Sequence, residues 1–318
     1  MSVKDEQLLA WISEEFYCKG ISQVDLAKKL RTSKATVSRL IQKAVAEGIV
    51  RFEITVPRQN NVQLEKELEE VFGISRAVVI NTNLLDEQDK MDHVGRIGAE
   101  FLPTFLNDGD IVGLSGGRSV NSLVKHLAQE DCTKQIEITQ LSGVYSEQAP
   151  QNSSLYAAEH MARKFGSKWH PLLLPAVMGS VHSRDVLIND PAFKKSFGIF
   201  EKINVAVLGV GSLLGDVPDS DLYRTGYLEE DELQKLKKQG AVGVILSNFI
   251  DADGNPVPSS LKERIISMSL DQLKAVPFSI GVANGPGKVL PVRAALKGGY
   301  YKSIITDSET AASLLENK

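Results

Sequence analysis

The chain has 318 residues, of which 42% are hydrophobic and 24% charged, and its net charge is −4. This length predicts two domains, and the composition is that of a soluble globular protein with a proper core. No apolar run reaches the ~20 residues of a membrane span, the start lacks a signal-peptide core, and the cysteines and histidines show no metal-ligand spacing. We therefore expect a cytoplasmic protein without metal or cofactor.

The N-terminal residues predict a helix over 7–17, because Leu8, Leu9, Ile12 and Phe16 recur at helical spacing. Gly20 should end this helix. The helix is expected to pack on the segment that follows it.

Residues 22–41 have the pattern of a helix-turn-helix. Ser22 can cap a first helix, and Asp25 completes a capping-box arrangement. Val24, Ala27 and Leu30 are expected to share one face of this helix. The small Ala27 would let the next helix approach closely.

Residues 31–33 form the expected turn, and Ser33 can cap a second helix whose Val37, Leu40 and Ile41 face the first one. In DNA-binding units of this kind, the N-terminal half of the second helix enters the major groove. The residues expected to contact DNA are Ser33, Lys34, Ala35, Thr36, Ser38, Arg39 and Lys43.

The charge of this segment supports that interpretation. Between Ser22 and Arg51, seven basic residues stand against two acidic ones, so the local charge is +5 and the remainder of a chain at −4 carries −9. A basic patch in an acidic protein is typical of a surface that meets phosphates. An ordinary helical hairpin with a solvated charged face is the alternative. Residues 49–54 alternate enough to predict a short strand, which would be a wing.

A linker is predicted at residues 57–61, which are proline and polar residues without an apolar face. Leu64, Leu68, Val71 and Phe72 then line one side of a short acidic helix that Gly73 closes. We expect this helix to support a homo-oligomer. The predicted domains are a DNA-binding domain over 1–56, a linker and oligomerisation helix over 57–75, and an effector-binding domain over 76–318.

From Ala77 onward, short apolar runs alternate with amphipathic helices. Strands are predicted at 77–81, 110–115, 136–141, 172–175, 203–209, 241–246, 278–283 and 303–306. Helices are predicted at 91–106, with a kink at Pro103, and at 152–165, 229–238, 289–296 and 308–315. This order indicates an α/β domain with an open, mainly parallel sheet covered by helices on both faces.

Four glycine-rich loops follow predicted strands, where open parallel sheets bind ligands. The first loop suits an anion, because its glycines allow amide groups to converge, a helix starts there and Arg118 adds charge. Each loop alone is more often a plain turn, but together they would surround one pocket for a phosphorylated or carboxylated small molecule. The candidate residues in the four loops are Ser115, Gly116, Gly117, Arg118 and Ser119; Ser142 and Gly143; Gly211 and Ser212; and Lys288.

Several stretches in order give the chain a resemblance to the SorC family of bacterial sugar-responsive transcription regulators. They include DIVGLSGGRS (110–119), TQLSGV (139–144), VAVLGVGSL (205–213), YRTGYL (223–228) and the C-terminal ALKGGYYKSIITDSETAASLL (295–315). The resemblance implies a helix-turn-helix joined to a Rossmann-like domain with the fold of sugar-phosphate isomerases and CoA transferases. It also implies a sugar or sugar-phosphate effector and a dimer or tetramer.

The resemblance assigns roles to the same loops and also shows departures. It implies a phosphate-binding loop at residues 115–119, further contacts from the second and third loops, and a distal cation at Lys288. Gly116 stands where the family often has tryptophan, which would remove part of the pocket wall. Ser142 stands where deoxyribonucleoside-type members have a Schiff-base lysine, and Val244 replaces a common acidic residue.

The sequence thus predicts a regulator, activator or repressor, of a carbohydrate-utilisation operon. Its expected partners are operator DNA, a sugar or sugar phosphate, and further copies of the chain. The alternative is an isomerase-class enzyme with an appended DNA-binding domain. Isomerisation needs a carboxylate base, and none of the four loops contains one.

Overall fold

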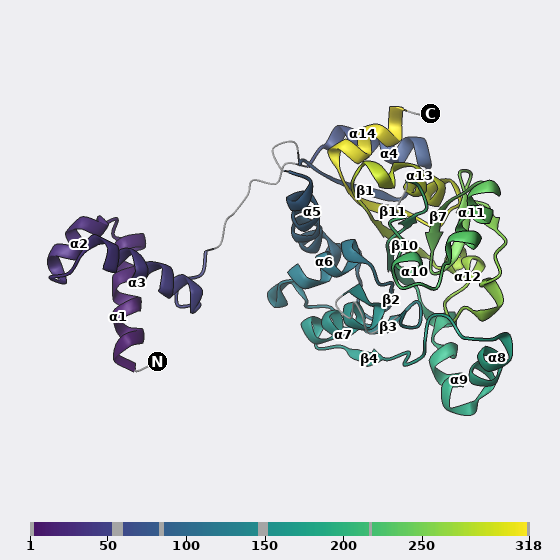
Figure 1. Cartoon of the computed structure of the whole chain (residues 1–318), viewed down its shortest axis with the longest axis horizontal. Coiled ribbons are helices and arrows are strands. Elements are labelled where there is room, and N and C mark those ends of the chain that lie inside the picture. The colour runs from purple at the N-terminus through teal and green to yellow at the C-terminus, as the bar shows by residue number, and fades with distance from the viewer. Residues whose placement is uncertain (1–2, 53–59, 83–85, 146–151, 216–217, 317–318) are drawn as a thin grey trace. The chain divides into compact units, whose positions relative to one another are not determined.

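The computed structural model describes residues 3–52, 60–82, 86–145, 152–215 and 218–316, shown in colour in Figure 1. The chain forms two compact units, Met1–Arg58 and Gln59–Lys318. In the described ranges, no helix is long and apolar enough to cross a membrane, and no cluster of potential metal-ligating side chains occurs.

The first unit is helical, with α1 (Val3–Ser13), a π-helical turn (Glu14–Cys18), α2 (Gln23–Lys29) and α3 (Lys34–Ala46). The predicted caps are present, because the Ser22 and Ser33 hydroxyls accept the Asp25 and Thr36 amides at 3.2 and 3.1 Å. The helices enclose a small core of Ile12, Leu26, Ala27, Val37 and Ile41.

The buried face of α2 differs from the prediction. Leu26 is fully buried, whereas Val24 is 47% exposed. At about 100° per residue, Leu26, Ala27 and Leu30 fall within one arc of the helix, and Val24 lies outside it. Residues three apart are rotated by about 300°, so the series that starts at Val24 moves around the helix. The prediction therefore named Val24 for the buried face, where Leu26 lies.

The predicted wing strand is not formed over residues 49–52, where Phe52 is 58% exposed. A strand needs a hydrogen-bonded neighbour, and no second strand lies in the described part of this unit. The remaining two residues of the predicted wing, and most of the predicted linker, lie outside the described ranges.

The second unit is built on a parallel sheet of seven strands. The strands are β1 (Arg76–Ile80), β2 (Ile111–Leu114), β3 (Glu137–Gln140), β4 (Lys168–His170), β5 (Val205–Leu208), β10 (Phe278–Val282) and β11 (Ser303–Asp307). Their order is β1-β11-β10-β5-β2-β3-β4, and every pair is parallel. The predicted open sheet is therefore confirmed.

Helices cover both faces of this sheet. Neighbouring strand residues point to opposite faces, so each strand packs against helices on both sides. Val205 and Val207 face α5 (Glu87–Phe101), α6 (Arg118–His126) and α7 (Ser154–Phe165). Ala206 and Leu208 face the other side, with α4 (Val62–Phe72), α13 (Val289–Lys297) and α14 (Ser308–Glu316). The predicted kink near Pro103 appears as the end of α5 and a 3₁₀ turn, Leu102–Phe105.

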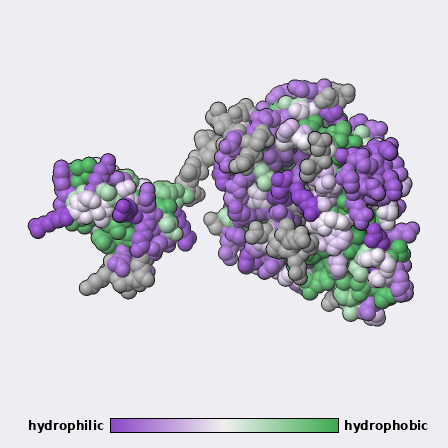
Figure 2. All heavy atoms as spheres, viewed as in Figure 1, coloured by the Kyte–Doolittle hydropathy of each residue, from purple (hydrophilic) through white to green (hydrophobic). Residues whose placement is uncertain are grey.

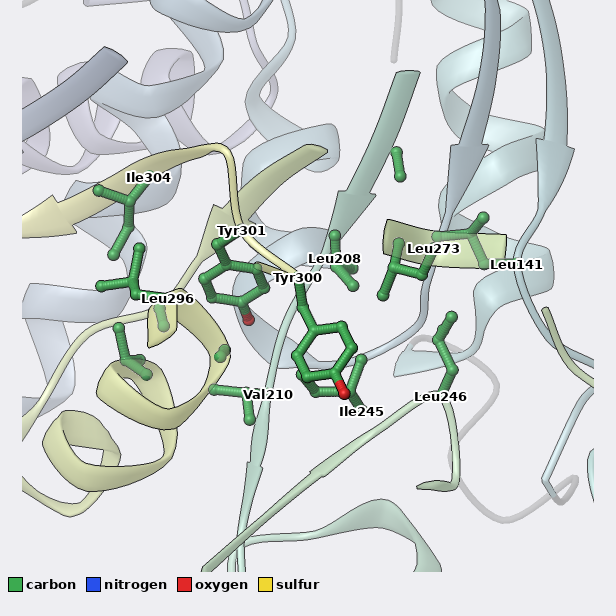
Figure 3. Packing of buried hydrophobic residues seen from close by; sticks show 14 of the residues in the cluster. Leu141, Leu208, Val210, Ile245, Leu246, Leu273, Leu296, Tyr300, Tyr301 and Ile304 are labelled. Atoms are coloured by element: carbon green, nitrogen blue, oxygen red, sulfur yellow. The ribbon is translucent and has the colours of Figure 1, made fainter. Parts of the chain in front are cut away.

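A second, antiparallel sheet joins β6 (Gly211–Ser212), β7 (Ala241–Ile245), β8 (Asn248–Asp251) and β9 (Pro256–Val257) in that order. The predicted strand at 241–246 is thus real but belongs to this sheet. Figure 3 shows the packing around the buried Tyr300 and Tyr301, where Leu208 of the parallel sheet and Ile245 of the small sheet join one core.

The predicted strand at 172–175 is wrong, and the edge strand β4 lies just before it. The Gln140 side chain accepts the Leu172 amide at 2.9 Å and donates to its carbonyl at 3.3 Å. Because a side chain satisfies this backbone, residue 172 needs no strand partner. Leu172 and Leu174 are buried, as on the covered face of a strand, whereas Leu173 is 65% exposed, and the run does not form a ladder.

The remaining helices are α8 (Val181–Asn189), α9 (Pro191–Gly198), α10 (Asp221–Arg224), α11 (Glu230–Lys238) and α12 (Leu270–Ala275). Apolar side chains reach the surface over α8 and α9, where Figure 2 shows a green area. Val186 of α8 is 53% exposed.

Candidate functional site

The first candidate site is the outer side of α3. Ser33, Lys34, Ala35, Thr36, Arg39 and Lys43 are exposed, and Ser38 is half-buried. In the part of the chain that the structure describes, Lys34 and Arg39 have no ion-pair partner, whereas Lys43 lies 3.7 Å from Glu47. The helix therefore presents short polar side chains and unpaired positive charge beside its capped N-terminus.

The second candidate site is a pocket at the carboxyl edge of the parallel sheet. It lies beyond β2, β3 and β5, and Lys288 reaches it from the loop after β10. From β2 the strand order runs outward through β3 to β4, and from β5 it runs the other way through β10 to β1. The pocket thus lies at the switch point of the sheet, where ligands bind in such folds.

We call this cavity the basic pocket. Its volume is about 90 Å³, and its lining includes Ser115, Gly116, Gly117, Arg118, Ser119, Ser142, Gly211 and Lys288 of the predicted set. The structure also places Tyr145, Asp219, Asp221, Arg224, Val244 and Ser247 in the lining. A second cavity of about 620 Å³, the neighbouring cavity, shares Arg118, Ser119, Asp219 and Lys288 with it.

The loop after β2 leads directly into α6. Gly117 precedes the helix and has no side chain to cap it, so the amides of the first turn, at Arg118, Ser119 and Val120, lack a helical partner. The Ser115 hydroxyl fixes the loop by accepting the Gly209 amide at 3.2 Å. An uncapped helix start of this kind attracts anions.

Three basic side chains in the pocket converge on one carboxylate, Asp219. Arg118 and Arg224 donate to its Oδ1 at 2.7 and 2.6 Å, and the Lys288 ammonium lies 2.8 Å from its Oδ2. Arg224 also donates to Asp221 at 2.5 Å. The three cations and two carboxylates leave the pocket with one positive charge.

Lys288 is not the surface lysine that its position in a loop would suggest, because its side chain is only 16% exposed. Besides the Asp219 carboxylate, it donates to the Val210 carbonyl at 2.9 Å and to the Asp219 carbonyl at 3.2 Å. An ammonium group has three donors. All three are therefore engaged.

Burial and charge act in opposite directions on this cluster. Burial alone would raise the pKa of the Asp219 carboxyl, but Lys288 and the arginines outweigh it and hold that pKa well below its usual range. Burial lowers the pKa of the Lys288 ammonium, an effect that the Asp219 charge opposes. Asp219 is thus ionised at neutral pH.

Two predicted residues do not line the basic pocket. Ser212 faces the neighbouring cavity. Gly143 lies where the chain passes another backbone, since a Cβ there would stand 2.5 Å from the Leu174 and Pro175 carbonyl oxygens. The need for glycine at this position is therefore steric.

Gly116 does not open a gap in the wall, although it stands where the family often has tryptophan. A Cβ at this position would lie 2.7 Å from the Asn152 carbonyl oxygen and 2.8 Å from the Ser154 amide. The start of α7 fills the space that a larger side chain would take. The expectation of a missing wall was wrong for this reason.

The pocket does contain carboxylates, although none of the four predicted loops carries one. Asp219 and Asp221 follow β6 and lie outside the four loops, yet both line the pocket. Arg224 belongs to the stretch YRTGYL, one of those that carry the family resemblance, and it is not among the predicted site residues. That stretch was the available signal for a third cation.

A switch-point pocket with an uncapped helix start, in a chain that also carries a helix-turn-helix, is the arrangement of a ligand-controlled DNA-binding protein. Residues 56–316 match the family described as "Putative sugar-binding domain", and residues 16–51 match the winged helix-turn-helix DNA-binding family. The chain belongs to the SorC family of transcriptional regulators with a sugar-binding domain.

Relatives and solved structures agree with this assignment. The chain is 31% identical over 317 residues to the deoxyribonucleoside regulator of Bacillus subtilis, covering all of both chains. It is 29% identical over 316 residues to the sorbitol operon regulator of Klebsiella pneumoniae, covering 98% of each. The crystal structure of that full-length regulator superposes with a TM-score of 0.77, at 28% identity over 99% of this chain and 100% of that one. These relatives are regulators, and the chain is a regulator rather than an enzyme.

Proposed function

We propose that this protein controls a carbohydrate-utilisation operon, and that a sugar or sugar phosphate bound in the basic pocket sets its affinity for operator DNA. Residues on the outer side of α3 would contact the operator. The regulator would work as a homo-oligomer, either a dimer or a tetramer. Because it must reach the chromosome, the proposal also includes a cytoplasmic location.

The main observation that supports a sugar or sugar phosphate as the effector is the arrangement of charge in the basic pocket. Arg118, Arg224 and Lys288 converge beside the uncapped start of α6, at the switch point of the sheet. Positive side chains and free amides favour an anionic group, and the hydroxyls of Tyr145 and Ser247 in the same lining can bond to sugar hydroxyls.

The printed names of the relatives support the same proposal. One of them regulates a sorbitol operon and another is a deoxyribonucleoside regulator, so both names refer to sugars or compounds that contain a sugar. In a regulator of this kind, effector and operator change each other's affinity by the same factor. Binding in the basic pocket should therefore be measurable as a change in DNA affinity.

The test is calorimetry of the full chain with a panel of sugars and sugar phosphates, repeated for Arg118→Ala and Lys288→Ala. Removing one cation from a charge-assisted hydrogen bond should cost about 1.5 to 3 kcal/mol, a tenfold to hundredfold loss of affinity. Both variants should bind DNA without effector nearly as wild type does, and they should lose the response to effector.

Arg163→Ala is the matched control, because Arg163 is exposed on α7 outside the pocket lining. It should bind effector as wild type does. Unchanged affinity for the best ligand in both pocket variants would show that the effector binds elsewhere.

A further inference from the structure

We infer that the Asp219 carboxylate occupies the place of the effector's anionic group and is displaced by it, so that the pocket selects phosphate monoesters over carboxylates and uncharged sugars. This inference rests on the proposed function, since it assigns a selection mechanism to the same pocket. It starts from the hydrogen bonds of Asp219.

In the present arrangement the cations are already bound. The single Asp219 carboxylate accepts from both arginines and from Lys288, at 2.6 to 2.8 Å. The three donors of Lys288 are all in use. An anionic ligand can therefore bond to Lys288 only if one of these acceptors gives way.

The carboxylate can leave without the backbone. The Asp219 carbonyl accepts the Ser212 amide at 2.9 Å and is also bonded to Lys288, so β6 and Lys288 hold the main chain in place. Rotation of the side chain alone would release one donor each from Arg118, Arg224 and Lys288. Three converging donors match the three terminal oxygens of a phosphate monoester.

The charge balance favours the same ligand. With Asp219 in place the pocket carries a charge of +1, from three cations and two carboxylates. Without its carboxylate the pocket carries +2, which a phosphate dianion neutralises. A ligand carboxylate would only replace one monoanion by another, and an uncharged sugar would bring no negative charge to the three cations.

The cavities around Asp219 leave room for a ligand. Asp219 lines both the basic pocket, of about 90 Å³, and the neighbouring cavity, of about 620 Å³. Together with Arg118, Ser119 and Lys288, which also line both cavities, it lies at their boundary. Rotation of its side chain would leave the cations at this boundary, with the neighbouring cavity beside them for the rest of the ligand.

The experiment compares the full-length wild type with Asp219→Asn in calorimetric titrations with inorganic phosphate and with acetate, at pH about 8, where phosphate is mainly a dianion. Wild type should bind phosphate and bind acetate at least tenfold more weakly. Asp219→Asn removes the internal competitor, so both anions should bind roughly tenfold more tightly or better. The gain for acetate should be at least as large as the gain for phosphate.

Two variants serve as controls. Asp219→Glu keeps a carboxylate and should show no gain. Asp253→Asn removes a carboxylate that is 73% exposed and paired with Lys297 outside the pocket lining, and it should bind as wild type does. If Asp219→Asn is poorly folded by thermal melting, Asp219→Ser gives the same comparison, because it also removes the charge.

The outcomes separate this inference from the proposed function. If wild type binds phosphate and Arg118→Ala weakens it, but Asp219→Asn binds phosphate no better, the displacement of Asp219 is wrong and the effector site stands. If neither wild type nor Asp219→Asn binds phosphate, the displacement is wrong, and the calorimetric panel of sugars and sugar phosphates decides the proposed function separately. Phosphate binding that appears only in Asp219→Asn would show that phosphate does not displace the carboxylate, and it would overturn the inference.

Discussion

Individual side chains of α3 differ in which part of a DNA duplex they can contact, the bases or the phosphates. Arg39 is exposed and unpaired in the described part of the chain, and its planar guanidinium can bond to two acceptors of a guanine. Lys34 stands in the first turn of the helix, where a flexible ammonium group suits a phosphate. We therefore expect Arg39 to read bases and Lys34 to contribute charge.

This division predicts different losses for two alanine variants. Arg39→Ala should cost about 1 to 3 kcal/mol on the operator and relax the sequence preference, whereas Lys34→Ala should weaken operator and random duplex alike. Binding would be measured by fluorescence anisotropy at several salt concentrations, with Lys66→Ala on α4 as a charge-matched control. Equal losses on both duplexes for Arg39→Ala would remove it from base recognition.

At the residue scale, the sequence predicted the parts of the pocket that lie in loops next to strands. Ser115 and Arg118 could be found because they adjoin β2 and the start of α6. Asp219 and Arg224 could not be found in this way, since they follow a two-residue strand in a segment without hydrophobic periodicity. Only the fold brings Arg224 within reach of Asp219 and Lys288.

At the element scale, α4 protects an edge of the parallel sheet. The strand β1 is terminal in the strand order, so one side of its backbone lacks a partner strand. Glu65 accepts the Val79 amide at 2.9 Å, and Glu69 accepts the Ala77 amide at 2.8 Å. Covered edges of this kind prevent pairing with other chains.

Substitutions of Glu65 can separate its role as acceptor of the Val79 amide from the effect of its negative charge. Glu65→Ala should cost about 1 to 3 kcal/mol of unfolding free energy, because the Val79 amide loses its acceptor. Glu65→Gln keeps an acceptor oxygen and should be at least as stable as wild type at neutral pH. Urea denaturation followed by circular dichroism would measure both, with the exposed Glu70→Ala as the control.

The pH dependence of that comparison follows from the pKa of Glu65. Burial raises it above the ordinary 4.5, and the Glu69 charge adds to the shift, although the Val79 hydrogen bond opposes it. The folded state therefore holds the proton more tightly, and Glu65 contributes less to stability as pH rises above about 4.5. The advantage of Glu65→Gln should shrink at lower pH. A glutamine variant as unstable as the alanine variant would contradict the edge role.

The elements themselves were predicted where periodicity and length agree. The six runs that became β1, β2, β3, β5, β10 and β11 are short and apolar and lie among amphipathic helices. The run at 172–175 has the same appearance, but a buried glutamine satisfies the backbone of Leu172. Composition cannot distinguish these cases, because both bury apolar side chains.

At the scale of the whole molecule, the sequence predicted a helix that supports assembly, and the structure shows how much of that helix remains available. Leu68 is fully buried in the core of the second unit, with Leu64 and Phe72 packed against the same core. Val62 and Val71 remain 57% and 42% exposed. Any contribution of α4 to an interface between chains must come from this outer side.

An oligomer remains a prediction, and it follows from the size of the DNA-contacting surface. One α3 helix offers seven candidate residues, too small a surface for tight binding, whereas two linked helices bind two half-sites with a large gain in affinity. Light scattering should therefore give a multiple of the 34.7 kDa chain mass, and footprints should cover two half-sites. Inserting about five base pairs between the half-sites turns one of them to the opposite face of the duplex, so affinity should fall at least tenfold, and an insertion of about ten should restore part of it.

The variant Val71→Asp tests whether the outer side of α4 lies in the interface between chains. A shift toward the single-chain mass would place α4 in the interface, and an unchanged mass would exclude Val71 from it. A 34.7 kDa species that protects one half-site would contradict the oligomer itself.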